Sequence, residues 1–544
     1  MAAYFFESVI FLEFKKFTQD KIDEIIPYLS KYISDSCEYT PANILIWFEY
    51  YGLEYEIKDN QLFFRTIDKN KPLFFLPIGD DICKGVNMII DYCKTNDIVP
   101  VFFAPESNYF NNFNSKYKDL YSSFELRDNF DYLYKREDLV NLKGKKYHSK
   151  RNHISIFDKT YNWVYEDITR ENFDEVLEFS KEWYNENKND SLKAELQGLK
   201  KIFNYFDYLG AKGGLIRVDG KIVAYTLGTP INKNVFDINF EKALKNYNGA
   251  YTVINREFAS RLTTEYINRE DDIGIPGLRK AKMSYYPSKL LKKYVCYPKS
   301  FLQQSKDLFL NSFNDETKQS ADLFVNQFIS DGFYYKYVNG EIVSQLFVLK
   351  HYFNDKIAGY IYAASTKEEY RKKGYMAKLL EQTKQDYEIL FLKPADSKLA
   401  DYYKKIGFTK PSYIRILSGK ANENTVSRNI SEITQVQDIR QKIIDGPAFV
   451  PDDKCIDYAL HEYTAVSDGN NFAYLTVYKD KIIFNELLTV DDPSDFINAV
   501  CNKYNIKNYI AQCYDKTGTD FSGLVYAADE NDIPENIYLG MLLD

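Results

Sequence analysis

The chain has 544 residues, 45% of them hydrophobic and 27% charged, a balance typical of a globular protein with several cores. At roughly 100–200 residues per domain, the length predicts three or four domains. The formal net charge of −8 disfavours non-specific nucleic-acid binding, because an acidic surface repels phosphate backbones. Seven cysteines without a C-x-x-C pair, and only four histidines, indicate no zinc site. They favour a reduced, cytoplasmic environment, and no apolar run is long enough for a membrane span.

Four predicted hairpins recur along the chain. They fall in residues 53–67, 214–228, 333–350 and 472–488. Their turns are centred on Asp59 and Asn60, Asp219 and Gly220, Asn339 and Gly340, and Lys479 and Asp480. Asn-Gly and Asp-Gly favour two-residue turns because both positions take a positive φ. The spacing of about 120–160 residues is a domain length and favours four copies of one α/β module, although chance recurrence remains an alternative.

The first half of the chain contains three specific segments. They lie in residues 142–153, 240–252 and 267–285, and residues 1–297 as a whole resemble the phosphatidylglycerol lysyltransferase C-terminal domain family. The resemblance implies a tandem of two GNAT-like folds, in residues 1–140 and 141–298. Related transferases move an aminoacyl group from tRNA to a lipid or peptide acceptor.

Two charged clusters in this half are candidate substrate-binding sites. The basic run in residues 143–151 could grip phosphates of CoA, of a tRNA end or of a lipid headgroup; the alternative is a solvated linker. The acidic cluster in residues 268–272 could hold a substrate ammonium; the alternative is internal pairing with the following basic residues. The candidate residues are Lys146, Arg151, Asn268, Glu270, Asp271, Arg279 and Lys282. No standard pyrophosphate cradle is expected between residues 1 and 300.

Two polar stretches suggest boundaries in the second half. Residues 299–316 are interpreted as a linker into a new helix, and residues 418–427 as the close of the third module. The predicted domains are therefore residues 299–420 and residues 428–544. In the last domain we expect helices near residues 436–444 and 493–504, a closing strand, and a structural role in completing an acceptor pocket.

A basic, glycine-containing loop opens a predicted helix directly after a predicted strand. The strand covers residues 358–366, the turn residues 367–370, and the helix residues 377–386. Between them lies the sequence Arg371-Lys372-Lys373-Gly374-Tyr375-Met376. Free N–H groups at a helix start and the helix dipole favour a phosphate there, and glycine lets the backbone approach closely. This pattern predicts a pyrophosphate site.

Arg-x-x-Gly-x-small before a helix resembles the acyl-CoA loop of the GNAT superfamily. Met376 stands where Gly or Ala is usual, and the segment is similar to that of the enhanced-intracellular-survival branch, where an apolar residue is tolerated. The resemblance implies that the backbone of Ala364, Ser365 and Thr366 pairs with pantetheine. The expected acetyl-CoA-binding residues are Ala364, Ser365, Thr366, Arg371, Lys372, Lys373, Gly374, Tyr375 and Met376.

A second GNAT-like signature follows downstream. A predicted helix in residues 398–406 ends at Gly407 and Phe408, with Tyr403 four residues before the glycine. The resemblance implies that Tyr403 holds the CoA sulfur and donates a proton to the leaving thiolate, which a phenol near pKa 10 can do. A core tyrosine is the alternative. In the enhanced-intracellular-survival branch the C-terminal carboxylate reaches the site, which makes Asp544 a candidate, with a frayed end as its alternative.

The sequence thus predicts a mixed α/β (α+β) chain of tandem GNAT-like folds with splayed central sheets. Its expected activity is acetyl-CoA-dependent N-acylation of a small-molecule or peptide amine by direct attack in a ternary complex, with no metal. One alternative is aminoacyl-tRNA-dependent transfer by the N-terminal half, so tRNA is the single nucleic-acid partner kept open. The other is a non-catalytic CoA-binding protein.

Overall fold

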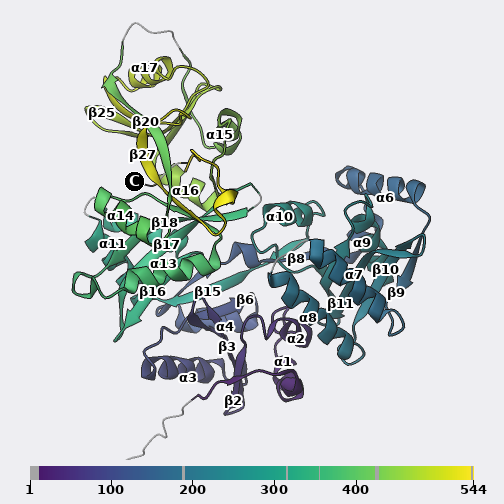
Figure 1. Ribbon diagram of the computed structural model, residues 1–544. Coiled ribbons are helices and arrows are strands. Elements are labelled where there is room, and N and C mark those ends of the chain that lie inside the picture. The colour runs from purple at the N-terminus through teal and green to yellow at the C-terminus, as the bar shows by residue number, and fades with distance from the viewer. Residues whose placement is uncertain are drawn as a thin grey trace, which may run out of the picture. The chain divides into compact units, whose positions relative to one another are not determined.

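A computed structural model describes residues 12–186, 190–313, 316–354, 356–422, 428–540 and 543 of the chain. The chain divides into two compact units, Met1–Phe301 and Leu302–Asp544, each of which is considered by itself (Figure 1). Both contain mixed sheets covered by helices, which confirms the predicted α/β class.

The first sheet of the N-terminal unit is built mainly from residues 54–125. Its strands run in the order β1-β2-β3-β4-β6-β15-β7, and β5 pairs with β3. The strands are β1 Lys15–Lys16, β2 Glu54–Lys58, β3 Gln61–Asp68, β4 Lys71–Phe75, β5 Ile78–Gly79, β6 Phe102–Pro105, β7 Tyr121–Glu125 and β15 Lys293–Pro298. The helices of this part are α1 Ile22–Leu29, α2 Pro41–Trp47, α3 Ile82–Thr95 and α4 Asn108–Tyr117.

The second sheet of this unit has the order β14-β8-β13-β12-β11-β10-β9. Its strands are β8 Asp131–Lys135, β9 Trp163–Asp167, β10 Lys212–Val218, β11 Lys221–Pro230, β12 Val235–Ala243, β13 Tyr266–Asn268 and β14 Lys289–Leu291. Its helices are α5 Arg136–Asn141, α6 His148–Thr160, α7 Phe173–Glu186, α8 Asp190–Asn204, α9 Ala250–Arg261 and α10 Pro276–Met283. The core under α7 and α8 lies on one face of the sheet, and the core under α6 and α9 on the other.

The two sheets of the N-terminal unit are interleaved in the sequence, because strands of the first sheet come both before and after the strands of the second. The chain leaves the first sheet after β7, forms the whole second sheet, and returns as β15 between β6 and β7. As a result, Asp131 at the start of β8 and Lys293 at the start of β15 are brought together, although 162 positions separate them in the sequence. This junction is where the polar cluster described below is found.

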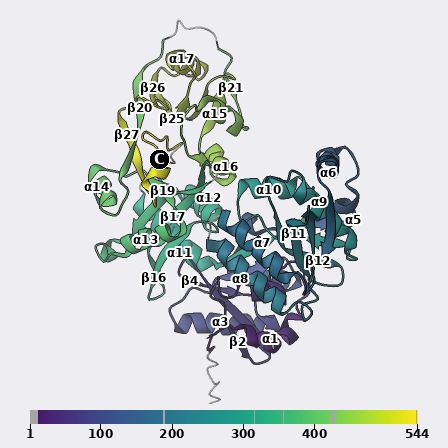
Figure 2. The ribbon, with the colours of Figure 1, turned by 45° about the vertical axis from the view of Figure 1, so that its right-hand side comes forward.

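The C-terminal unit contains one long sheet in the order β16-β17-β18-β19-β27-β20-β26-β25-β24-β23-β21, with β22 beside β17. Figure 2 shows β20 running from the part near α14 to the part near α17. The strands are β16 Phe333–Val338, β17 Glu341–Phe353, β18 Lys356–Thr366, β19 Ile389–Leu392, β20 Lys410–Lys420, β21 Ser431–Glu432, β22 Val450–Pro451, β23 Thr464–Ser467, β24 Phe472–Val477, β25 Lys481–Leu488, β26 Asn508–Cys513 and β27 Asp520–Ala527. The helices are α11 Lys299–Ser312, α12 Lys318–Phe328, α13 Tyr375–Asp386, α14 Ser397–Lys405, α15 Gln437–Ile443, α16 Asp453–Glu462 and α17 Ser494–Lys503.

All four predicted hairpins form. They are β2–β3, β10–β11, β16–β17 and β24–β25. In the first three hairpins both turn residues take positive φ, which two-residue turns require and which the Asp-Asn, Asp-Gly and Asn-Gly pairs tolerate. The division of the chain into four domains stays a prediction.

Two of the predicted connections are wrong. Residues 299–312 form the helix α11, because Phe301, Leu302, Leu308 and Phe309 are buried at helical spacing between polar residues that face outward. The first three residues of the stretch taken to close the third module, 418–420, still belong to β20, which pairs there with β26, and residues 423–427 lie outside the described residues. Among the helices of the described ranges, none is both long and apolar enough to cross a membrane.

Candidate functional site

The predicted phosphate cradle lies at the start of α13. Gly374 has φ +78° and stands at the N-cap position without a side-chain cap, so the first-turn N–H groups of α13 have no capping partner within the described chain. Apart from Gly374 and its two chain neighbours, no heavy atom of the described residues lies within 4 Å of the place that a Cβ would occupy on Gly374. The basic side chains Arg371, Lys372 and Lys373 are exposed around this open position. The arrangement suits a ligand with several negative charges.

The strands next to the cradle diverge. β18 and β19 pair in parallel only between Ala358–Tyr360 and Ile389–Phe391, so the second half of β18, residues 361–366, lies beyond this pairing. A bulge near Ala363, whose φ is +53°, bends β18 just before Ala364, Ser365 and Thr366. Arg371 Nε donates to the Thr366 carbonyl at 3.2 Å and fixes the loop against the end of the strand. The three residues expected to meet pantetheine therefore lie beside the cradle.

Met376, which departs from the usual small residue, packs against the core of this region. That core contains Leu379, Leu380, Leu392 and Phe408. The methionine side chain thus extends the apolar face of α13, while the loop backbone around Gly374 stays open. This contact explains how an apolar residue is accommodated at that position.

Tyr403 lies on the buried face of α14, with 9% of its surface exposed, in the same core as Leu380 and Phe408. Burial, with a smaller contribution from the neighbouring Tyr402, raises the pKa of Tyr403 to about 12, so the phenol holds its proton at neutral pH. Tyr402 is half-buried and packs against the same core, with its ring centre 5.4 Å from that of Tyr403. Asp544, the candidate base, lies outside the described residues.

The basic run of the N-terminal unit is largely helical. Lys146 is exposed in a short 3-10 turn, with its ammonium 5.0 Å from the Tyr286 ring centre. Arg151 on α6 turns back and donates to the Leu142 and Gly144 carbonyls, which closes the loop before the helix. Of these two candidates, Lys146 is free to meet a ligand, whereas Arg151 has a structural partner.

The basic residues of α10 are tied to their own surroundings. Arg279 binds Asp272 through two nitrogens, at 2.9 and 2.8 Å, and also contacts Asp128. Lys282 donates to the carbonyl of Arg269 at 2.6 Å and to that of Asp271. The internal pairing kept as an alternative for the acidic loop is thus present for Asp272 and Arg279.

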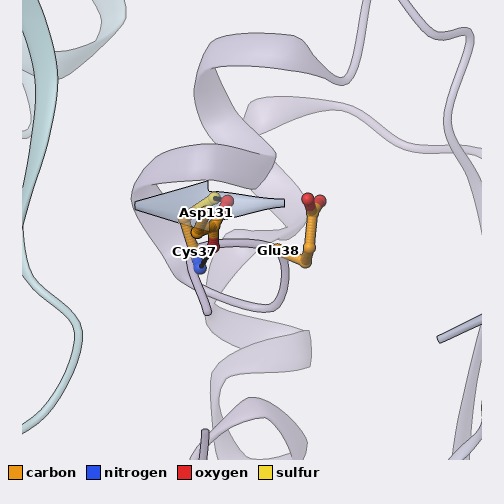
Figure 3. Close-up of side chains that lie close together, drawn as sticks. All are labelled: Cys37, Glu38 and Asp131. Atoms are coloured by element: carbon orange, nitrogen blue, oxygen red, sulfur yellow. Dashed lines mark hydrogen bonds between the residues drawn. The ribbon is translucent and has the colours of Figure 1, made fainter. Parts of the chain in front are cut away.

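The other acidic residues of this loop join a buried cluster between the two sheets of the N-terminal unit. Lys293, 1% exposed, forms ion pairs with Asp131 at 2.7 Å and with Glu38. Asn268 Nδ2 donates to Asp131 at 3.1 Å, and Cys37 donates its N–H and thiol to the same carboxylate. Figure 3 shows Cys37, Glu38 and Asp131 gathered at one point. Burial opposes ionisation of Asp131, but Lys293 and these hydrogen bonds outweigh it and lower the pKa of Asp131.

Three more carboxylates line the same cluster. Burial raises the pKa of Glu270 to about 8 and that of Asp271 to about 6, against the nearby lysines. Asp237, fully buried on β12, has its pKa raised well above its usual range by burial and by Glu270. Asn239 Nδ2 donates to Asp237 at 2.9 Å and to Glu270 at 3.2 Å. Glu270 holds a positive φ of 53°, a left-handed conformation that is uncommon for non-glycine residues.

A second polar site lies where β12 and β13 diverge. These strands pair only between Val235–Asp237 and Tyr266–Asn268, and beyond that point Arg269 Nη2 donates to Glu241 at 2.6 Å. Asn255 on α9 donates to the other oxygen of Glu241 at 3.3 Å. Arg269 Nη1 and Asn255 Oδ1 are both buried and have no hydrogen-bond partner among the described residues. One donor and one acceptor are therefore available on either side of Glu241.

Lys150 on α6 borders this second site. Its ammonium lies 3.9 Å from the centre of the Tyr285 ring, which Arg269 also approaches. Burial lowers the pKa of Lys150 to about 8, and the charge of Arg269 acts in the same direction. Sequence reasoning did not single out Glu241, Asn255 and Lys150 as site residues, because they come from different elements. The available signals were Glu241 within the segment of residues 240–252 and Lys150 within the basic run.

Residues 31–297 match the family described as phosphatidylglycerol lysyltransferase, C-terminal. A solved Bacteroides thetaiotaomicron protein of unknown function is 34% identical, with a TM-score of 0.49, over 53% of this chain and 99% of its own. A GCN5-related N-acetyltransferase from Kribbella flavida is 13% identical, with a TM-score of 0.34, over 43% of this chain and 71% of its own.

An uncharacterized protein of Mycoplasmoides gallisepticum is 25% identical over 173 residues, which is 30% of this chain. The matched part spans 55% of the length of that curated relative.

Proposed function

Residues 31–297 belong to the phosphatidylglycerol lysyltransferase C-terminal family, and with that premise for the first unit we propose that residues 302–544 form a second acyltransferase, which moves an acetyl group from acetyl-CoA to a primary amine. The observation that carries this proposal is the divergence of β18 from β19 beside the open, basic start of α13. A CoA molecule offers the matching chemistry: a pyrophosphate for the helix start and an amide-containing arm for the bent end of β18.

In this mechanism the amine nitrogen attacks the thioester carbonyl carbon directly in a ternary complex. The nitrogen of the resulting adduct loses its proton to solvent or to a base, the carbon–sulfur bond breaks, and the departing sulfur takes the proton of the Tyr403 hydroxyl. The Tyr403 phenolate then regains a proton from solvent. The first-turn N–H groups of α13, with Arg371, Lys372 and Lys373, hold the pyrophosphate. Holding the two reactants in line supplies much of the rate.

The Tyr403→Phe variant tests the chemical step. Removing the hydroxyl should lower kcat by about 100- to 10,000-fold, because the thiolate loses its proton donor, while acetyl-CoA affinity should change little. The measurement is amine-dependent release of free CoA thiol across a panel of primary amines and polyamines. Tyr402→Phe is the matched control and should keep most of the activity. Equal losses in both variants would reject Tyr403 as the donor.

Aminoacyl transfer by the N-terminal unit is a second candidate, and the unpartnered atoms beside Glu241 favour it. An aminoacyl ester presents a carbonyl oxygen for Arg269 Nη1 and an α-ammonium for Asn255 Oδ1, two atoms that otherwise have no partner. Lys150, with its lowered pKa, is placed to accept a proton from the acceptor.

This second activity should depend on pH through Lys150. A lysine with a pKa of about 8 is protonated below that value and becomes a base above it, so turnover of lysyl-tRNA, corrected for spontaneous hydrolysis, should rise between about pH 7 and 9. Lys150→Arg keeps the charge throughout this range and should abolish the rise. Lys159→Arg, an exposed change on the same helix, should leave the profile intact. A profile unchanged in Lys150→Arg would remove Lys150 from the mechanism.

A further inference from the structure

The buried cluster of the N-terminal unit contains a group of ligand atoms that no protein cation neutralises directly. Cys37 Sγ, one oxygen of Asp237 and one of Glu270 lie within 4.8 Å of one another. Cys37 and Asp237 are 2% and 0% exposed, and Glu270 lies at the half-buried rim. Asp237 Oδ1 has no hydrogen-bond partner. A buried carboxylate oxygen without a partner is costly, so Asp237 either keeps a proton or meets a cation at this position.

The neighbouring group in Figure 3 has a different character, although it shares Cys37. There, Lys293 already lies between Glu38 and Asp131, bonded to both. The Lys293 ammonium already neutralises Glu38 and Asp131, so a metal ion would have to displace it there. The side formed by Asp237 and Glu270 is bridged by a neutral amide, Asn239. The open position for a cation is therefore on the Asp237 side.

The charges of the whole cluster point to a doubly charged ion. Its carboxylates are Glu38, Asp131, Asp237, Glu270 and Asp271, and its ammonium groups are Lys282 and Lys293. Counted as fully ionised, the five carboxylates exceed the two ammonium groups by three charges. Burial and the neighbouring carboxylates raise the pKa of Asp237, Glu270 and Cys37, so these groups hold protons in the empty site, and a dication would replace those protons.

We propose that Cys37, Asp237 and Glu270 bind a divalent metal ion of the zinc class. Zinc takes thiolate sulfur at about 2.3 Å and carboxylate oxygen at about 2.0–2.2 Å in tetrahedral sites, which places ligand atoms about 3.3–3.8 Å apart. The three ligand atoms lie within 4.8 Å of one another, so binding the ion would draw them closer together. A fourth position remains for water.

The ion would tie together segments that are distant in sequence. Cys37 lies in the connection between α1 and α2, Asp237 is on β12, and Glu270 follows β13. A metal here joins the loop beside the first sheet to the second sheet of the unit. This differs from the sequence expectation of no metal, which rested on the absence of C-x-x-C and histidine spacing. The three ligands are separated by 200 and 33 positions and form no sequence motif.

Cobalt(II) is the probe for this site in the purified full-length chain after chelator treatment. The wild type should bind one equivalent with a thiolate-to-cobalt charge-transfer band, and zinc should displace it. Cys37→Ser should lose the band. Cys296→Ser, at another buried thiol whose sulfur contacts Ser123, is the control and should keep it. Metal analysis of untreated protein should find one zinc-class ion per chain.

Asp237→Asn keeps the side-chain volume and should weaken cobalt binding at least about tenfold, with the fold checked by circular dichroism. This variant decides the matter if Cys37→Ser does not fold. The proposal is overturned if wild-type protein shows no charge-transfer band, or if the band persists unchanged in Cys37→Ser or Asp237→Asn. It is also overturned if lysine ethyl ester, but no metal, binds in an Asp237-dependent way, because the cluster would then hold a substrate ammonium.

Discussion

Replacing Lys293 with methionine should lower the free energy of unfolding of the N-terminal unit by about 3–5 kcal/mol. Lys293 is 1% exposed and neutralises Asp131, which is 0% exposed, as well as Glu38. Methionine has a similar length but no charge, so Asp131 would be left ionised in a dry environment or forced to take up a proton. Either outcome costs free energy, because the pKa of Asp131 is held low by this ammonium.

Chemical denaturation at neutral pH measures this loss, and a neighbouring residue provides the control. Lys292 pairs with Glu125 at the surface, so Lys292→Met should change stability by less than about 1 kcal/mol. Combining Lys293→Met with Asp131→Asn should recover part of the loss, because neither charge is then left alone. A Lys293→Met variant as stable as Lys292→Met would show that the buried pair does not hold the two sheets together.

Much of the fold was predictable because the signals are local. The turns at Asp59, Asp219 and Asn339 need only the conformational preferences of two adjacent residues, and all three hairpins form. The helix α11 was interpreted as a linker because polar residues outnumber apolar ones in Lys299–Ser312. The apolar residues at Phe301, Leu302, Leu308 and Phe309 nevertheless recur at helical spacing.

The interleaving of the two N-terminal sheets could not be foreseen. The pairing of β15 with β6 and β7 spans more than 160 positions, and no local pattern specifies it. The exchange is nevertheless what brings Asp131 and Lys293 together. Long-range pairings of this kind depend on burial of the whole sheet. No single segment of the sequence shows how the whole sheet is buried.

The two candidate sites also differ in how far the sequence predicts them. The cradle at Arg371 to Gly374 is continuous in sequence, because one loop and one helix start provide all its groups. The site of Glu241, Asn255, Arg269 and Lys150 is assembled from β12, α9, α6 and the chain after β13. Only the tertiary structure shows that two of its atoms lack partners. The acidic loop was recognised from sequence, but its division between Arg279 and the buried cluster was not.

Gly374→Asp should abolish or weaken acetyl-CoA binding at least about 100-fold. The new carboxylate would occupy the open position at the start of α13 and repel the pyrophosphate that the free N–H groups attract. A positive φ of 78° also penalises any side chain there, so the conformational cost needs its own control. Gly469→Asp provides it, since Gly469 has φ +93°, equally open space and no role in the cradle.

Isothermal titration of acetyl-CoA into the full-length chain and these two variants tests the central claim most directly. We predict micromolar binding by the wild type and by Gly469→Asp, and none in that range by Gly374→Asp. Such a result supports residues 302–544 as an acetyl-CoA-dependent transferase unit. No binding by the wild type, or equal binding by Gly374→Asp, would contradict that account and leave aminoacyl transfer by the N-terminal unit as the activity to pursue.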